Sequence, residues 1–283
     1  MAQRPIRALV TDVDGTLTAK NRLLDMEAVK ALRAVEAAGI PVVLASGNVL
    51  PVLYSLAYFI GTTGPIVAEN GGLVLFRGST QRLSDPRAAY MAHQAVSSRL
   101  GLQRLFTDQW RITEVAYPEG EGTFEAVKRA VDEAGFADRV RVERTGFAVH
   151  LMAPNHSKFR GVERALSLIE VDPSQALAIG DSDNDVSMLA GCGASAALGD
   201  ATPGLKAAAA FVCLAPGGRG IWQALEHYEV VVRREAPTAA GGGRAPTTGA
   251  GAPQRPPGPQ RRRRGPARTK RKAGPARARA RPR

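Results

Sequence analysis

The 283-residue sequence has few cysteines and no long apolar run. Its two cysteines, Cys192 and Cys213, form no Cys-x-x-Cys pair and no histidine stands at metal-ligand spacing, so neither a disulfide framework nor a zinc site is indicated. The longest uncharged apolar run, Ala207 to Pro216, is far shorter than the roughly 20 residues of a membrane-spanning helix. Arg4 and Arg7 interrupt any apolar signal-peptide core. We therefore expect a soluble cytoplasmic protein.

The C-terminal part of the chain lacks acidic and large apolar residues. Residues 236–283 hold 14 of the 38 lysines and arginines and no Asp or Glu, so residues 1–235 carry 24 basic and 26 acidic side chains, a net charge of −2. A segment of this composition, rich in proline, glycine and arginine, buries too little apolar surface to offset its chain entropy. We predict that residues 236–283 form a disordered basic tail on a nearly neutral body.

The tail suggests a second class of function. Arg261 to Arg264 and the basic residues that follow can neutralise the phosphates of nucleic acid, with an affinity that is sensitive to salt and blind to sequence. The tail has no aromatic side chain on which a base could stack. The alternatives are a nucleic-acid-binding extension and a low-complexity extension without function.

The body contains short apolar runs that end in small polar residues. Ile6 to Val10, Pro41 to Ala45 and Pro65 to Ala68 have the length and composition of buried strands. Helical apolar periods over Asp25 to Ala38 and Leu50 to Ile60 separate these strands. Alternation of strand and helix implies right-handed crossovers and a parallel sheet covered on both faces, so the sequence predicts a Rossmann-like α/β fold.

The pattern changes from about Arg82. Asp85 to Leu100 and Thr123 to Ala134 are predicted helices, and the predicted strands between and after them are Arg111 to Ala116, Arg139 to Glu143 and Phe147 to Met152. Two helices with three short strands form a small α+β unit. We interpret this unit as a cap domain inserted into the larger domain.

The larger domain then resumes with a helix over Asn155 to Ile169 and a strand over Ala176 to Ile179. Short helices and strands alternate afterwards, at Val186 to Ala190, Ala194 to Leu198, Ala207 to Leu214 and Ile221 to Tyr228. The predicted organisation is therefore a core made of residues 1–81 and 155–235, a cap of residues 82–154, and the tail of residues 236–283.

Carboxylates gather at the ends of the predicted strands. Asp12 and Asp14 are two residues apart after the first strand, so their side chains lean to the same side of an extended backbone. Two carboxylates so close require either a bound cation or a retained proton. Taken alone, this pair is more typical of an Asp-rich turn that caps the next helix, and only the matching parts in the rest of the chain favour a site. The run G-D-S-D-N-D from Gly180 to Asp185 follows another strand and favours a cation site.

Four motifs of the chain resemble those of the haloacid dehalogenase-like phosphatases. They are D-V-D-G-T from Asp12, an apolar strand ending at Ser46, Lys158, and G-D-S-D-N-D from Gly180, in that order. The placement of the insert, between the second and third motifs, is similar to that of the cap in one subgroup of the family. More narrowly, L-A-S-G-N-V-L-P and G-P-I-V-A-E-N-G-G resemble the archaeal-type phosphoglycolate phosphatases. The resemblance covers roughly residues 5–228.

The residues themselves suggest roles in phosphate ester hydrolysis. Asp12, first after the strand, is our candidate nucleophile, since a carboxylate can split the reaction through an aspartyl-phosphate. Negative phosphate can approach it if oxygen ligands hold Mg²⁺. Asp181 is the strongest candidate for a second carboxylate ligand, with Asp185 a direct or water-mediated one. The resemblance implies that Asp14 offers the metal its backbone carbonyl, which leaves its side chain free as general acid and base.

Further residues are candidates for binding substrate. The Lys158 ammonium can neutralise a phosphate oxygen, and Ser46 and the Gly47 amide can donate hydrogen bonds. Asn184 is expected to fix its loop or to hold Lys158. Taken singly, Ser46 is more typical of a helix cap and Lys158 of a solvated helix residue. Arg160 is a possible substitute for Lys158.

For several other polar residues the sequence favours a structural role or leaves the role open. Asp183 is expected to be structural, and Glu69 and Asn70 fit either a helpful role at the strand end or a turn. His150 is more typical of a core or interface histidine. In the insert, basic groups can meet a second anion of the substrate, namely Arg111, Arg139, Arg141, Arg144 and His150.

Together these features predict a magnesium-dependent phosphomonoester hydrolase that acts through an aspartyl-phosphate, as a monomer or homodimer. The resemblance implies 2-phosphoglycolate as the substrate. The alternatives are a sugar phosphate or another small phosphorylated metabolite, or nucleic-acid binding through the tail.

Overall fold

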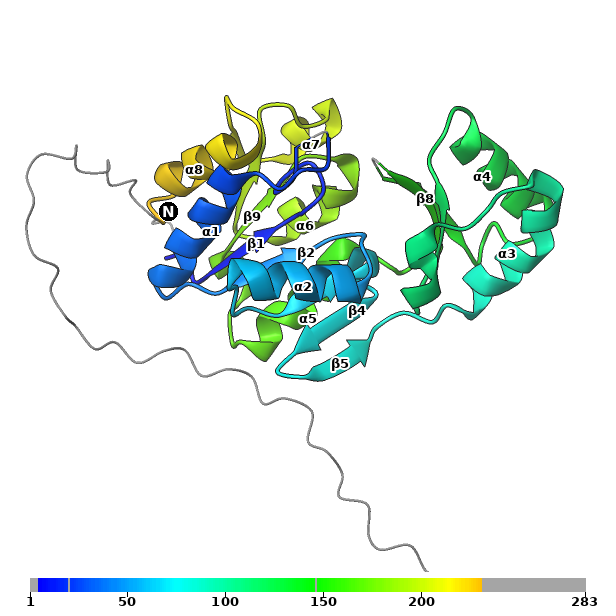
Figure 1. The fold of residues 1–283 in the computed structure, drawn as a ribbon, viewed down its shortest axis with the longest axis horizontal. Helices are drawn as coiled ribbons and strands as arrows, with labels where there is room; N and C mark the ends of the chain where they lie inside the picture. Colours follow the sequence, from blue (N-terminus) through cyan, green and yellow to red (C-terminus); the bar gives the residue numbers. More distant parts are fainter. Residues whose placement is uncertain (1–4, 20, 146, 231–283) are drawn as a thin grey trace, which may run out of the picture. The chain divides into compact units, whose positions relative to one another are not determined.

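The computed structural model describes residues 5–19, 21–145 and 147–230, which form two separate sheets with their helices (Figure 1). The predicted disorder of residues 236–283 and the predicted nucleic-acid contacts of Arg261 to Arg264 lie outside the described residues. Among the described residues, none of the helices combines the length and the apolar character that crossing a membrane requires.

The main sheet is largely parallel and confirms the predicted α/β fold class. Among the described residues its strands follow the order β11-β10-β9-β1-β2-β3-β4-β5, and every pair from β11 to β3 is parallel. Apolar residues fill these strands because helices cover both faces. The strands are β1 (Ala8–Thr11), β2 (Val42–Ala45), β3 (Ile66–Ala68), β4 (Leu73–Phe76), β5 (Ser79–Arg82), β9 (Ala176–Gly180), β10 (Ala194–Ala197) and β11 (Phe211–Val212).

Two apolar layers hold helices against this sheet. Leu9 points into a cluster with α1, α2 and α8, and its neighbour Val10 points into a second cluster with α5, α6 and α7. Successive strand residues face opposite sides, so one strand serves both layers. The helices are α1 (Met26–Ala37), α2 (Leu50–Ile60), α5 (Lys158–Leu168), α6 (Val186–Gly191), α7 (Pro203–Ala208) and α8 (Gly217–His227), with 3-10 turns η1 (Glu69–Gly71), η3 (Pro173–Gln175) and η4 (Asp183–Asp185).

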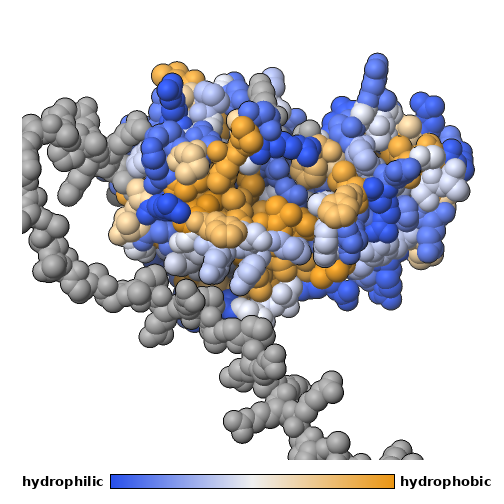
Figure 2. Space-filling model, in the orientation of Figure 1, coloured by the Kyte–Doolittle hydropathy of each residue, from blue (hydrophilic) through white to orange (hydrophobic). Residues whose placement is uncertain are grey.

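The second sheet belongs to a smaller unit between β5 and α5, which we call the α+β insert (residues 87–152). Its strands pair antiparallel in the order β6-β8-β7, and a buried cluster that includes Tyr117, Val131 and Leu151 joins them to α3 and α4. Figure 2 shows a mostly polar surface over this insert on the face drawn. Its elements are α3 (Arg87–Leu100), η2 (Phe106–Trp110), β6 (Val115–Pro118), α4 (Thr123–Glu133), β7 (Arg141–Arg144) and β8 (Ala148–Met152).

Four segments differ from the sequence-based expectation. The sheet continues beyond β3 into an antiparallel hairpin, β4 and β5, which the sequence analysis did not identify. The strand expected over Arg111 to Ala116 begins only at Val115, because residues 111–114 leave the turn η2 and bond to Gly47 and Glu69 instead of pairing in the sheet. Ile221 to Tyr228 falls almost wholly within helix α8, and Ala207 to Leu214 crosses from α7 into β11.

Candidate active site

The candidate site lies where three neighbouring parallel strands end. β1 pairs with β2 on one side and with β9 on the other, so Thr11 lies opposite both Leu44 and Ile179. The residues just beyond these partners, among them Asp12 and Asp181, therefore emerge at one edge of the sheet. From β1 the strand order extends to β2 and β3 on one side and to β9 and β10 on the other. Open α/β sheets bind their ligands at such a switch point.

Asp12, Asp181 and Asp185 form a compact carboxylate cluster. One oxygen from each lies within 4.8 Å of the others. Asp12 and Asp185 are buried, with exposed fractions of 3% and 0%. Burial, followed by the charge of Asp185, raises the pKa of Asp12 well above its usual value, and burial with the same neighbour raises the pKa of Asp181 to about 7. Three carboxylate oxygens this close are a ligand set suited to a hard divalent cation.

Gly15 allows the first loop to approach this cluster. A Cβ at this position would lie 2.2 Å from Oδ2 of Asp181, and its φ of +88° lies in the left-handed region. The loop also holds Asp181 directly, because the Thr16 hydroxyl donates to Oδ1 at 2.9 Å. The sequence analysis did not identify Thr16, since its role depends on the approach of β9.

Lys158 lies inside the site, at the first turn of α5. The Ser157 hydroxyl caps this helix by accepting from the amide of Arg160. The Lys158 side chain is 1% exposed, and its ammonium contacts Oδ1 of Asp12 at 2.8 Å and Oδ1 of Asp185. Burial acts to lower the pKa of Lys158, but the two carboxylates outweigh it and raise that pKa. Arg160, the substitute considered from the sequence, is exposed.

Asp14 is held away from the carboxylate cluster. Its Oδ2 accepts from Ser46 Oγ at 3.0 Å and from Asn48 Nδ2 at 2.7 Å. The same Ser46 oxygen accepts from the Asn48 amide, so this hydroxyl is engaged within the site rather than at a helix cap. Asn48 was not singled out from the sequence. A fixed carboxylate beside the cluster is suited to proton transfer.

The G-D-S-D-N-D loop is tied by its own side chains. Oδ2 of Asp185 accepts from the amides of Asp181 and Ser182, and Asn184 accepts from the Ser182 hydroxyl. Asn184 therefore fixes its loop, and the bond to Lys158 considered as an alternative is absent among the described contacts. Asp183 accepts from Thr202, away from the cluster, as a structural residue would.

A cavity of ≈ 240 Å³ opens over these groups. Besides the acids it is lined by Gly47, Asn184, Arg22 and, from the α+β insert, Thr145 and Phe147. Within the described residues, the basic groups expected to meet a second anion lie elsewhere: Arg111, Arg139, Arg141, Arg144 and His150 are not among its lining. Arg22 and Phe147 carried no signal in the sequence, because only the fold brings their loops together.

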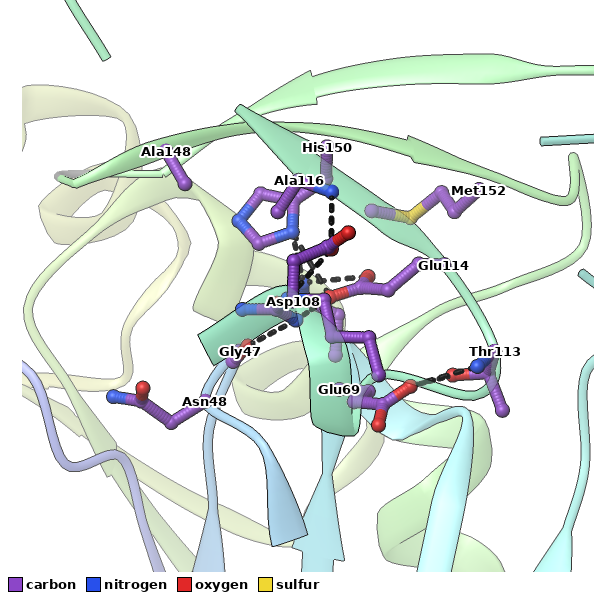
Figure 3. Close-up of polar contacts among 12 residues, drawn as sticks. Gly47, Asn48, Glu69, Asp108, Thr113, Glu114, Ala116, Ala148, His150 and Met152 are labelled. Carbon is purple, nitrogen blue, oxygen red and sulfur yellow. Dashed lines mark hydrogen bonds and ion pairs between the residues drawn. The ribbon is translucent and has the colours of Figure 1, made fainter. Parts of the chain in front are cut away.

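Arg111 instead joins the α+β insert to the loop that carries Gly47. Its buried guanidinium donates to the Gly47 carbonyl at 2.9 Å and pairs with Glu114, which also pairs with His150 at 2.9 Å. Figure 3 shows Glu114 and His150 facing each other above Gly47. Burial acts to raise the pKa of Glu114, but His150 and Arg111 outweigh it and hold that pKa at about 2. His150 is thus a paired buried residue.

Glu69 and Asn70 make further contacts across this junction. Glu69 accepts from the Thr113 hydroxyl and from the amides of Ile112 and Thr113 (Figure 3). Burial, followed by the charge of Glu114, raises the pKa of Glu69 to about 7. Asn70 donates to Glu114 at 3.1 Å. Both residues lie in the buried turn η1, which was one of the two expected alternatives, and from there they contact the α+β insert.

Family comparison gives the class of this protein. The chain belongs to the haloacid dehalogenase-like hydrolase family, whose model matches residues 9–98 and 106–225. The resemblance noted in the sequence motifs is thereby confirmed, and the chain is an enzyme of the hydrolase class.

The chain is also similar to curated proteins whose activity is named. The chain is 34% identical over 223 residues to a phosphoglycolate phosphatase of Methanothermobacter thermautotrophicus, covering 79% of this chain and 99% of the relative. It is 30% identical over 227 residues to one of Thermoplasma acidophilum, covering 80% and 100%. A crystal structure of a Thermoplasma acidophilum protein superposes with a TM-score of 0.74 at 29% identity, covering 81% and 100%. A hydrolase of Bacteroides thetaiotaomicron at 19% identity, covering 79% and 98% with a TM-score of 0.67, shares the fold.

Proposed function

We propose that the protein is a magnesium-dependent phosphoric monoester hydrolase that converts 2-phosphoglycolate to glycolate and phosphate. One observation carries the proposal: Asp12, Lys158 and Asp181, 146 and 23 positions apart in the chain, meet in one buried site with Asp14 and Asp185 beside them. The curated relatives named phosphoglycolate phosphatase support the choice of substrate.

The residues perform the first step as follows. A carboxylate oxygen of Asp12 attacks phosphorus, the bond from phosphorus to the ester oxygen breaks, and an aspartyl-phosphate forms. Lys158 holds Oδ1 of Asp12 and so leaves the other oxygen for attack. Asp14, oriented by Ser46 and Asn48, donates its proton to the departing alkoxide.

The second step regenerates the enzyme. A water molecule attacks the aspartyl-phosphate, Asp14 takes its proton, and phosphate leaves. Mg²⁺, held by Asp12, Asp181, Asp185 and the Asp14 carbonyl, would supply positive charge that lets phosphate and carboxylate approach. Lys158 and the Gly47 amide would support the phosphate oxygens. Thr145 and Phe147 line the cavity from the α+β insert, where they would limit the access of bulk water to the phosphate.

The test is phosphate release from a panel of phosphorylated acids and sugars, with and without Mg²⁺. Asp12→Asn is expected to lower kcat for 2-phosphoglycolate by at least about 10³-fold, because an amide cannot act as the nucleophile. Asp183→Asn is the matched control, since Asp183 lies in the same loop as the cluster but bonds Thr202. Full turnover by Asp12→Asn contradicts the mechanism, and preference for a sugar phosphate contradicts the substrate.

A further inference from the structure

Arg22 is a cation in the wall of a cavity whose other charged lining residues are acidic. The lining includes Asp12, Asp14 and Asp181, and of the described residues that line it Arg22 is the positively charged one. The three carboxylates lie at the end proposed to hold metal and phosphate. Arg22 follows Asp12 and Asp14 in the same connection between β1 and α1, but it lies within the loop that the bridge between Thr18 and Leu24 closes, and it brings a positive charge to the cavity wall.

The loop that carries Arg22 is closed by its own backbone. Thr18 and Leu24 form an antiparallel bridge, the Ala19 amide donates to Leu23 at 2.9 Å, and the Arg22 amide donates to Ala19 at 2.8 Å. Arg22 has a φ of 64°, in the left-handed region that side chains other than glycine rarely adopt. Such a conformation is unfavourable and is retained where the surroundings determine it, often at ligand sites.

The guanidinium of Arg22 has one stabilising neighbour. It lies 5.8 Å from the ring centroid of Phe147, which comes from the α+β insert and lines the same cavity. Within the described residues no hydrogen bond or ion pair engages the guanidinium, so its donors are available to a ligand. Stacking on an aromatic ring restricts the plane of a guanidinium and leaves its edge for bidentate contacts.

Three arginines of the α+β insert that were candidates for meeting an anion are already engaged in ion pairs. Arg111 pairs with Glu114, Arg141 with Glu143, and Arg144 with Glu119. An anion that entered the cavity beyond the phosphate site would therefore meet Arg22 first.

We infer that Arg22 is a specificity-determining residue that binds a carboxylate of the substrate, in bidentate contact, while the phosphate occupies the site of Asp12 and Lys158. This inference rests on the proposed function and extends it to the substrate class: phosphorylated carboxylic acids rather than phosphate esters of uncharged alcohols. Phe147 positions the guanidinium from the insert side.

The experiment compares 2-phosphoglycolate with 2-hydroxyethyl phosphate, which has a similar length but no carboxylate. Arg22→Ala is expected to lower kcat/KM for 2-phosphoglycolate by about 10- to 100-fold, the range for loss of a charge-assisted hydrogen-bonded pair, and to change the value for 2-hydroxyethyl phosphate by less than about 3-fold. Arg22→Lys should restore only part of the loss, because an ammonium lacks the planar fork.

Arg77→Ala is the matched control. Arg77 also has a left-handed φ, of 47°, and lies 4.9 Å from the ring of Phe76, but it stands in the turn between β4 and β5, outside the lining of the cavity. It should leave both substrates unaffected.

Two outcomes separate failure of this inference from failure of the proposed function. Wild-type enzyme that prefers 2-phosphoglycolate, with the preference kept in Arg22→Ala, overturns the role of Arg22 alone. An equal loss on both substrates also overturns it, since a carboxylate contact acts on one of them. Wild-type enzyme without any preference contradicts the proposed substrate and this inference with it.

Discussion

At the scale of single residues, Lys158 shows how the site balances its charges. Its buried ammonium contacts Asp12 and Asp185, and a third carboxylate, Asp181, lies close by. Opposite charges about 4 Å apart, at an effective dielectric constant near 20, attract by roughly 4 kcal/mol. Removal of one partner from a buried set of charges leaves the others uncompensated and is strongly destabilising.

We therefore predict that Lys158→Met lowers kcat by about 10²- to 10³-fold and lowers the free energy of unfolding by about 3–5 kcal/mol in the absence of divalent metal. Mg²⁺ should recover part of the stability, because it supplies the lost positive charge. Steady-state phosphate release and urea unfolding with EDTA or Mg²⁺ measure both effects. Arg160→Met, an exposed change two residues further along α5, is the control. A variant with wild-type stability in EDTA would contradict the charge balance.

The site residues that the sequence could indicate are those within ordered motifs. Asp12, Asp14 and the Gly180 to Asp185 loop follow strands directly, so strand ends alone placed them near one sheet edge. The loop after β1 also holds Thr16 and Arg22, and the loop after β2 holds Asn48. The contacts of these residues depend on side-chain directions that no local pattern encodes. Arg111 was expected near substrate and is instead buried against Gly47, since burial of a charge follows from partners distant in the sequence.

At the scale of elements, the start of α5 depends on close packing with the turn after β3. Gly71 has a φ of +97°, and a Cβ there would lie 2.0 Å from the Ser157 carbonyl oxygen. Gly161, one turn into α5, approaches Gly71 as well, with its own added Cβ 2.6 Å from the Gly71 Cα. The two glycines let the helix that carries Lys158 lie against η1.

Gly71→Ala is expected to lower the free energy of unfolding by more than about 3 kcal/mol and to lower kcat, because the start of α5 must move. Gly78→Ala is a matched control: Gly78 has a φ of +78°, yet an added Cβ meets nothing within 4 Å. That control should cost only about 1 kcal/mol, for the unfavourable backbone conformation, and keep wild-type kcat. Thermal unfolding and phosphate release measure the difference, and equal effects of the two variants would show that the contact with Ser157 is unimportant.

Helices and strands with a strong period of apolar residues were predictable from the sequence. Elements that depend on pairing with distant segments were not. The apolar period marked α2 from Leu50 to Ile60 with the bounds that the structure has, and Gly61 ends the helix in a left-handed conformation. The β4–β5 hairpin was missed because β5 is exposed and polar, with no alternating pattern, and extends the sheet through backbone pairing with β4. Residues 111–114 read as a strand but turn instead to reach Gly47 and Glu69.

At the scale of the whole molecule, protons and divalent metal compete for the carboxylate cluster and so set the pH dependence of stability. The pKa of Asp181 in the folded protein is about 7, against 3.8 for the ordinary side chain. The folded state thus holds a proton that the unfolded state has released. Without metal, this contribution to the free energy of unfolding is present below about pH 4 and is lost as the pH rises towards 7.

Mg²⁺ should reverse this trend, since a ligand carboxylate must be ionised. We predict that Mg²⁺, at a fixed concentration of about 100 times its Kd at pH 8, raises the free energy of unfolding by about 2.7 kcal/mol at pH 8. For a protein of this size that is about 5–10 °C in Tm. The same concentration should raise the free energy of unfolding by less at pH 5.5, because protons compete for the ligands. Calorimetry at both pH values, with EDTA or Mg²⁺, measures the increment. Asp181→Asn should reduce its pH dependence, whereas Asp183→Asn should keep it, and an increment equal at both pH values in wild type would rule out the competition.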